Sequence, residues 1–209
     1  MRQSRKLDHL KFALYLADGP GTTGFDDITI IHNCLPNLAF DNVRLDTSLV
    51  GMKLPHPVFV NAITGGAPDV TSINRSLAEF CQATACPMAV GSQFAALEDP
   101  VVEESYRVVR QIYPNGIIFA NLGAHATVEQ AKRAVDMIEA NALQIHLNVA
   151  QEMFMPEGDR DFSGYLANIE AIAAALPVPV VVKEVGNGIA REQARQLAEL
   201  GVAAIDVAG

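Results

Sequence analysis

The chain contains the stretch Gln144-Ile145-His146-Leu147-Asn148-Val149-Ala150-Gln151-Glu152, which begins as an apolar strand and ends in polar residues. Its isoleucine and leucine alternate with Gln, His and Asn at a period of two residues, as in a β-strand. We expect the side chains of His146, Asn148, Gln151 and Glu152 to gather at the end of this strand. A neutral base, two amides and a carboxylate suit a polar, phosphorylated substrate with a divalent cation, because Mg²⁺ prefers carboxylate oxygen and substrate phosphate. The alternative is a polar loop after a buried strand.

The same kind of unit recurs along the chain from residue 58 onward. Each unit has a short β-rich run, a polar or glycine-rich turn and an amphipathic helix. The runs cover 58–63, 88–90, 117–121, 143–147, 179–183 and 203–207, and their starts lie 24 to 36 residues apart. Strands that alternate with helices at this spacing predict βαβ units and a parallel sheet.

Several of the expected helices have recognisable ends. Thr127 and Gln130 fit a capping box before a helix over 131–140. Three further boundaries are expected at Asp69, which would cap a helix running to residue 85, at Asp99-Pro100, before a helix over 101–112, and at Gly201, after a helix over 189–200.

The strand ends carry the polar residues. These are Thr64-Gly65-Gly66, Gly91-Ser92-Gln93, Asn121-Leu122-Gly123, the stretch 146–152, Lys183-Glu184 and Asp206. A TIM (β/α)₈ barrel keeps its active site at the carboxyl ends of its strands. The first strand is not followed by a Gly-x-Gly-x-x-Gly fingerprint, so a dinucleotide-binding sheet is disfavoured. The sequence therefore predicts an α/β fold of the TIM-barrel class.

The predicted barrel is incomplete. A closed barrel has eight strands and typically about 250 residues, whereas residues 58–209 supply about six strands. We expect a fragment, a truncated form, or a part that something else completes. Residues 1–57 are expected to form an N-terminal extension that packs against the barrel and covers its mouth.

Composition limits the classes of function. The 209 residues are 50% hydrophobic, which is enough for one large core. A net charge of −9 argues against nucleic-acid binding and leaves any anionic substrate to local cations. Cys34, Cys81 and Cys86 form neither a metal spacing nor an even disulfide set, which favours reduced thiols in a cytoplasmic protein. The basic start lacks the apolar run of a signal peptide, and the apolar run 171–182 is too short to span a membrane.

Seven motifs occur in one order along the chain. They are Arg5-Lys6-Leu7-Asp8-His9, Asn61-Ala62-Ile63-Thr64-Gly65-Gly66, Gly91-Ser92-Gln93, Ala120-Asn121-Leu122-Gly123, His146-Leu147-Asn148 with Gln151-Glu152, Pro156-Glu157-Gly158-Asp159-Arg160, and Val182-Lys183-Glu184-Val185-Gly186. Together they resemble the type 2 isopentenyl-diphosphate isomerases, which are FMN-dependent (β/α)₈ barrels. The resemblance runs from residue 5 to the last residue. Ile63 stands where many members have Met, and Tyr165 where many have Trp.

The resemblance implies an enzyme of isoprenoid biosynthesis. It would interconvert isopentenyl and dimethylallyl diphosphate by adding a proton at one carbon and removing one from another, with no net redox change. Reduced FMN would be the acid–base agent, NADPH would reduce it, and Mg²⁺ would bridge to the diphosphate. The family also implies a homo-oligomer, a tetramer or larger, without a nucleic-acid or membrane partner.

The resemblance implies an FMN site at the strand ends. Its residues would be Ala62, Ile63, Thr64, Ser92, Asn121 and Lys183. Gly65-Gly66 would let a flat ring approach the backbone. Lys183 ends the apolar run 178–182, where a lysine is costly unless it meets an anion. The resemblance places it near N1 and C2=O of the flavin. The alternatives are a tight turn at the glycines, turn capping by Ser92 and Asn121, and a lysine that reaches solvent.

A substrate and metal site is implied in the same way. Arg5 and Lys6 would bind the diphosphate, Arg5 through forked donors and Lys6 as a point charge. The substrate side would be lined by His146, Asn148 and Gln151, with His146 and Gln151 as catalytic residues, and Glu152 would hold Mg²⁺. The alternatives are a solvated N-terminus and a surface glutamate. The loop 154–162 is expected to be either a mobile lid or a solvated loop.

Two other functions stay open. One is another FMN barrel of the 2-hydroxy-acid oxidase type, against which the Arg5-Lys6 and Gln151-Glu152 pairs weigh. The other is an inactive barrel fragment that binds no flavin.

Overall fold

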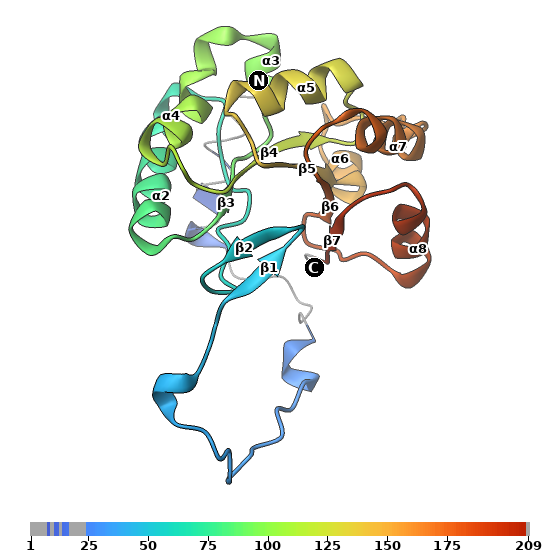
Figure 1. Cartoon of the computed structure of the whole chain (residues 1–209). Coiled ribbons are helices and arrows are strands. Elements are labelled where there is room, and N and C mark those ends of the chain that lie inside the picture. The colour runs from blue at the N-terminus through green and yellow to red at the C-terminus, as the bar shows by residue number, and fades with distance from the viewer. Residues whose placement is uncertain (1–7, 9–10, 13, 17–23, 208–209) are drawn as a thin grey trace.

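The computed structural model describes residue 8, residues 11–12 and 14–16, and residues 24–207. A parallel sheet of five strands has the order β3-β4-β5-β6-β7, so each strand pairs with the next one along the chain (Figure 1). Its strands are β3 (Met88–Ala89), β4 (Ile118–Gly123), β5 (Ala142–Leu147), β6 (Val180–Glu184) and β7 (Ala204–Asp206). This strand order is that of a partial TIM barrel and confirms the predicted fold class.

Helices follow the strands and flank the sheet (Figure 1). The α-helices are α2 (Thr71–Thr84), α3 (Phe94–Glu98), α4 (Glu104–Ile112), α5 (Val128–Met137), α6 (Val149–Phe154), α7 (Tyr165–Ala175) and α8 (Arg191–Glu199). Short 3₁₀ turns are η1 (Phe25–Asp27), η2 (Phe40–Asn42), η3 (Pro68–Val70) and η4 (Pro100–Val102). Within the described residues, no helix is long and apolar enough to cross a membrane.

Alternate residues of each strand point to opposite faces, and the two faces differ in character. The outward residues of β4, Ile118, Ala120 and Leu122, join the main core beneath the helices. The inward residues form layers inside the half-barrel. Near the amino ends the inner layer is apolar, with Ala89, Phe119, Ala142 and Val181. Toward the carboxyl ends it is polar, with Asn121, Gln144 and Lys183, all buried.

A hairpin that the sequence did not predict covers the apolar layer. Strands β1 (Thr47–Leu49) and β2 (Met52–Leu54) pair antiparallel around a two-residue turn. Both turn residues have positive φ, 44° at Val50 and 87° at Gly51, as a type I′ turn requires. Leu49, Val50 and Met52 pack on the apolar layer. This part of the N-terminal extension therefore closes the amino end of the half-barrel.

The run 58–63 does not form the regular strand that we predicted. Val60 makes a single parallel bridge to Met88, with its N–H donating to the carbonyl of Pro87 at 3.0 Å. The next N–H on the same side of the segment, that of Ala62 two residues later, donates to the Asn61 side chain at 2.8 Å. Because a side chain satisfies that donor locally, the ladder stops there, and the first barrel position is an extended segment.

The expected helix boundaries are partly confirmed. Thr127 and Gln130 make the complete capping box at the start of α5. Asp99 accepts from the N–H of Val101 at 3.1 Å, but η4 precedes α4, so the expected helix 101–112 is divided. Gly201 follows α8 with φ of 79°. The expected cap at Asp69 is wrong, because Asp69 lies inside η3 rather than before it and its side chain makes no cap bond.

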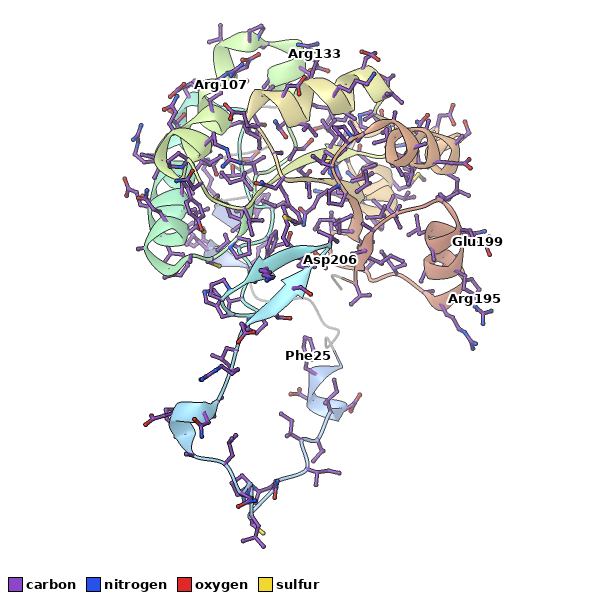
Figure 2. All side chains as sticks on the ribbon, viewed as in Figure 1. Phe25, Arg107, Arg133, Arg195, Glu199 and Asp206 are labelled. Carbon is purple, nitrogen blue, oxygen red and sulfur yellow. The ribbon has the colours of Figure 1, made fainter. Side chains whose placement is uncertain are left out.

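Residues 25–45 run away from the barrel as an extended arm with its side chains spread outward (Figure 2). Large apolar side chains on it are exposed, including Ile30 at 89%, Ile31 at 92% and Phe40 at 90%. Cys34 lies on this exposed arm, whereas Cys81 and Cys86 are buried, and all three thiols are free.

Buried polar contacts tie the first two strand ends to α4. Asn74, on α2, donates to the backbone carbonyls of Thr64 at 3.2 Å and Ser105 at 2.6 Å. The Ser105 hydroxyl accepts from the N–H of Gly66 at 2.8 Å. The hydroxyl of Tyr106 donates to the backbone carbonyl of Ser92. The loops after the first two barrel positions are thus fixed by α2 and α4.

Replacing Asn74 with alanine should lower the free energy of unfolding by about 1–3 kcal/mol, because two buried carbonyls each lose one hydrogen-bond donor. Urea denaturation measures the change. Gln82→Ala, on the exposed side of the same helix, is the matched control and should change stability by less than about 0.5 kcal/mol. Equal effects of the two substitutions would show that the hydrogen bonds of the buried Asn74 amide do not stabilise the fold.

Candidate active site

A hollow of about 370 Å³ lies at the carboxyl ends of the strands. This is within the usual size range of small-molecule sites, roughly 300–1,000 Å³. Its lining residues are Phe12, Ala62, Ile63, Gly91, Ser92, Asn121, His146, Gln151, Lys183 and Val185. Seven of these were predicted as site residues: Ala62, Ile63, Ser92, Asn121, His146, Gln151 and Lys183. The sheet therefore brings together residues up to 121 positions apart in sequence.

Thr64, a predicted flavin ligand, is buried beside the hollow at 2% exposure. Its backbone carbonyl accepts from Gly91 N–H at 2.9 Å and from Asn74. Its hydroxyl oxygen has no hydrogen-bond partner among the described residues. A buried, unsatisfied hydroxyl costs about 1–3 kcal/mol, so it marks a place where a ligand group would be stabilising.

The glycines near Thr64 are required by packing. A Cβ on Gly91 would lie 2.7–2.9 Å from backbone atoms of Thr64, so only glycine lets these two strand ends approach. A Cβ on Gly65 would lie 2.1 Å from the ring of Tyr106. The Gly65-Gly66 pair therefore forms a tight turn, with Gly66 at φ of 87°, and its contact with a flavin stays a prediction.

Lys183 lines the hollow from β6 and is 7% exposed. Its ammonium donates to the backbone carbonyl of Glu184 at 2.7 Å. Burial lowers the pKa of Lys183, and the carboxylates of Asp206 and Glu184 partly oppose that shift. The residue is thus a buried cation facing a cavity, not the solvent-reaching lysine of the alternative interpretation.

Three amide side chains connect Asp206 to His146 across the barrel interior. Asn61 donates to the Asp206 carboxylate at 2.6 Å, and Gln144 donates to the Asn61 oxygen at 3.0 Å. Asn121 donates to the Gln144 oxygen at 3.3 Å, and its own oxygen lies 2.9 Å from Nδ1 of His146. We call Asp206, Asn61, Gln144 and Asn121 the amide chain.

Glu152 lies on α6 and its carboxylate has two partners within the chain. Asn148, the residue before α6, donates to one oxygen at 2.7 Å. The N–H of Asp159 donates to the other at 2.9 Å. Asn148 is therefore turned to Glu152 and does not line the hollow. The guanidinium of Arg160 donates to four backbone carbonyls within residues 152–159, at 2.5–3.0 Å, so this loop is held against α6.

Arg5 and Lys6, the predicted diphosphate ligands, lie outside the described residues. Phe12 is described, and it reaches the lining of the hollow. The expectation that the extension covers the barrel mouth stays a prediction.

The chain was compared with protein-family models, curated proteins and solved structures. No family model matches it. It is 53% identical over 210 residues to the isopentenyl-diphosphate delta-isomerase of Bacillus mycoides. It is 54% identical over 209 residues to that of Bacillus cytotoxicus, and 52% identical over 210 residues to that of Bacillus cereus. Each alignment covers 100% of this chain and 60% of the relative.

Curated homologues that are 52–54% identical over the full chain are thus named isopentenyl-diphosphate delta-isomerase. The chain spans about 60% of the length of the curated isomerases that it matches. This agrees with the resemblance that the seven motifs carry.

Solved structures that resemble the chain support its fold. A mandelate oxidase mutant with (S)-mandelic acid superposes with a TM-score of 0.62 at 18% identity, over 96% of this chain and 66% of that one. A mandelate oxidase mutant with a monooxide FMN adduct gives 0.54 at 17% identity, over 80% and 51% of the two chains. At this identity the likeness shows the barrel fold alone.

The residues of this site fit a flavin. The hollow offers a buried cation at Lys183, the unsatisfied hydroxyl of Thr64 beside it, and short polar groups at Ser92 and Asn121. An anionic ring system would satisfy the first two groups, and the other two would orient it through hydrogen bonds.

The described residues offer few ligands for a metal ion. Among the described residues no group of three or more His, Cys, Asp or Glu side chains could hold an ion. Glu152 is a single carboxylate whose oxygens keep further lone pairs beyond their two partners. This donor set fits Mg²⁺, which commonly takes one or two carboxylates and completes its shell with substrate phosphates and water.

Several residues of this site were not assigned a role from the sequence. Asn61 lies in one of the seven motifs and Gln144 in the stretch 144–152. Their roles were not predicted, because a buried amide is not marked by any characteristic sequence spacing. Glu184 accepts from the N–H groups of Val185, Gly186 and Asn187 at 2.6–2.7 Å and so holds the loop after β6. Burial alone would raise the pKa of Glu184, but these backbone bonds lower it below its ordinary value.

Lys183→Met should raise the free energy of unfolding of the ligand-free protein at neutral pH. The lowered pKa means that the folded state holds the Lys183 proton less tightly than the unfolded chain. The wild-type protein should therefore gain stability as pH rises toward the ordinary lysine pKa, and the advantage of the variant should shrink over that range.

Urea denaturation at a series of pH values tests this expectation. Lys53→Met, at an exposed position of β2, is the control and should leave the pH dependence unchanged. A Lys183→Met variant that is less stable than wild type at neutral pH would mean that the ammonium is stabilised where it lies.

Proposed function

We propose that this chain is part of an enzyme that interconverts isopentenyl and dimethylallyl diphosphate with FMN and Mg²⁺. The proposal rests on the 53% identity to a curated isomerase together with one observation: seven predicted site residues line a single hollow at the strand ends. The reaction moves a double bond by adding a proton at one carbon and removing one at another. Bound reduced FMN would supply the acid–base chemistry beside the substrate carbons.

The protein's own residues would bind, orient and exclude water. The ammonium of Lys183 would stabilise negative charge on the ring system, more strongly because it is buried. Ser92 and Asn121 would hold the ring through hydrogen bonds, and Ile63 would cover it. His146 and Gln151 would face the substrate carbons and position them.

The diphosphate would lie at the open rim of the hollow. Glu152 would contribute one carboxylate to Mg²⁺, and Asn148 would orient that carboxylate through the 2.7 Å bond. Arg5 and Lys6 would supply the local cations that an acidic chain needs. The same resemblance leads us to propose NADPH as the reductant of FMN, a cytoplasmic location and a homo-oligomer.

A second candidate is an FMN-dependent oxidase of 2-hydroxy acids, because mandelate oxidase has the same barrel fold. The deciding experiment supplies the full-length protein with reduced FMN, Mg²⁺ and isopentenyl diphosphate without oxygen. The expected result is dimethylallyl diphosphate with no net oxidation of the flavin. Oxidation of lactate or glycolate with oxygen, and no isomerisation, would favour the oxidase. A protein that takes up no FMN would favour an inactive barrel.

Thr64→Val should separate a ligand role of this hydroxyl from a packing role. The substitution keeps the shape of the side chain and removes the unsatisfied oxygen. Without ligand the free energy of unfolding should rise by about 1 kcal/mol. The affinity for FMN should fall about fivefold, since a lost hydrogen bond of about 1 kcal/mol corresponds to that factor. Fluorescence titration of FMN measures the second effect, and unchanged affinity would contradict the role.

Glu152→Gln should weaken the binding of Mg²⁺. Removing the charge should raise the Mg²⁺ concentration for half-maximal isomerisation about tenfold or more, because a neutral amide is a poor ligand for a hard cation. Glu170→Gln, at an exposed position of α7, is the control. Turnover of Glu152→Gln with the wild-type Mg²⁺ requirement would show that the metal is held elsewhere.

A further inference from the structure

We propose that Gln144 is a positioning residue that, as the centre of the amide chain, fixes the proton of neutral His146 on Nδ1. Gln144 is 2% exposed and lies on β5, two residues before His146 and one layer deeper in the barrel. Asn121 links it to His146. The inference rests on the proposed function for its catalytic meaning, but the tautomer itself can be measured without substrate.

At one end of the amide chain, the hydrogen-bond role of the side chain is fixed. The carboxylate of Asp206 accepts hydrogen bonds and donates none. The Asn61 atom 2.6 Å from it must therefore be the donating Nδ2. A second constraint agrees: the backbone N–H of Ala62 donates to Oδ1 of the same side chain at 2.8 Å. A backbone N–H can only donate, so two independent contacts fix the orientation of the Asn61 amide.

The orientation of Asn61 fixes the orientations of the next two side chains of the amide chain. Oδ1 of Asn61 requires a donor, which is Nε2 of Gln144 at 3.0 Å. Oε1 of Gln144 then faces Asn121 and accepts from its Nδ2 at 3.3 Å. Oδ1 of Asn121 is thereby directed to the imidazole of His146. Reversing any one amide would bring two oxygens or two NH₂ groups together inside the barrel, where unmade hydrogen bonds are costly.

The last contact decides the tautomer. Oδ1 of Asn121 lies 2.9 Å from Nδ1 of His146, and a carbonyl oxygen accepts only, so Nδ1 carries the proton. The lone pair of the neutral ring is then on Nε2. At the hollow, neutral His146 would act through Nε2 as an acceptor or base, and it would donate from that atom only after protonation. The amide chain thus selects the chemistry that His146 offers to the substrate.

The measurement is a long-range ¹H–¹⁵N correlation spectrum of the full-length protein with ¹⁵N-labelled histidine, recorded where the imidazoles are neutral. It distinguishes the two tautomers of each ring. A His146→Asn variant assigns the signals. His56 is an internal reference for the opposite form, because its Nε2 lies 3.0 Å from the carbonyl of Thr84. We expect the Nδ1–H pattern for His146 and the Nε2–H pattern for His56. A dominant Nε2–H pattern at His146 overturns the inference.

A matched pair of variants tests the role of Gln144. Gln144→Glu, with its buried carboxyl group protonated, keeps an oxygen facing Nδ2 of Asn121 and a donor facing Oδ1 of Asn61, so His146 should keep the Nδ1–H pattern. Gln144→Met removes that acceptor and frees the Asn121 amide to turn over, so the pattern should become a mixture. Gln196→Met, at an exposed position of α8, should change nothing. Retention of the wild-type pattern in Gln144→Met overturns the positioning role.

The spectra also distinguish loss of the fold from a change in the tautomer of His146. Loss of the fold in a variant would also alter the signals of His56 and of His125, whose ring stacks on Phe94 at 4.1 Å, whereas a change confined to His146 reports the amide chain. Failure of the proposed isomerase activity would leave the wild-type tautomer pattern intact, so the two proposals fail independently.

Discussion

The alternation of side chains along each parallel strand is the constraint on which the rest of this structure depends. It sends Ile118, Ala120 and Leu122 outward beneath the helices and Phe119 and Asn121 inward. Since neighbouring strands keep their register, inward residues of equal height form a layer. The apolar layer and the polar layer above it follow from the order of residues within each strand, and the hollow is the space that the polar layer leaves at its top.

Burial of so many polar groups is tolerated because almost all of them are satisfied. The amides of Asn61, Asn121 and Gln144 satisfy one another, and Glu184 is held by three N–H groups. Two exceptions lie at or beside the hollow, the Thr64 hydroxyl and the ammonium of Lys183, which has one carbonyl and two nearby carboxylates but is depleted of water. Both exceptions would be relieved by an anionic, hydrogen-bonding ligand. A net charge of −9 therefore does not conflict with anion binding, because the attraction is local.

Much of this arrangement could be predicted from the sequence where the signals are local. The capping box at Thr127 depends on residues within one turn, and the polar strand ends depend on adjacent residues, so these predictions are confirmed. The hairpin at Val50-Gly51 was missed because a β-branched residue with positive φ is a rare choice for such a turn. The strand over 58–63 failed because the Asn61 side chain competes for the backbone of Ala62, which no propensity encodes.

The roles of Gln144 and Asn61 could not be predicted for a different reason. A buried amide in a strand looks the same whether it fills space or directs a neighbour, and only the three-dimensional contacts distinguish the two. The positions of Arg5 and Lys6, by contrast, were predicted from a motif and lie beyond the described residues, so their roles rest on the family alone.

The bond between Asn61 and Asp206 joins residues 145 positions apart. It belongs to the contacts of highest sequence separation, which close late because loop-closure entropy must first be overcome. A partly folded chain that has paired β4, β5 and β6 but not yet docked β7 would have the walls of the hollow without the carboxylate that orients its amides. The hollow would then form before its amides are oriented. Docking of β7 would be the step that fixes the proton of His146 on one ring nitrogen.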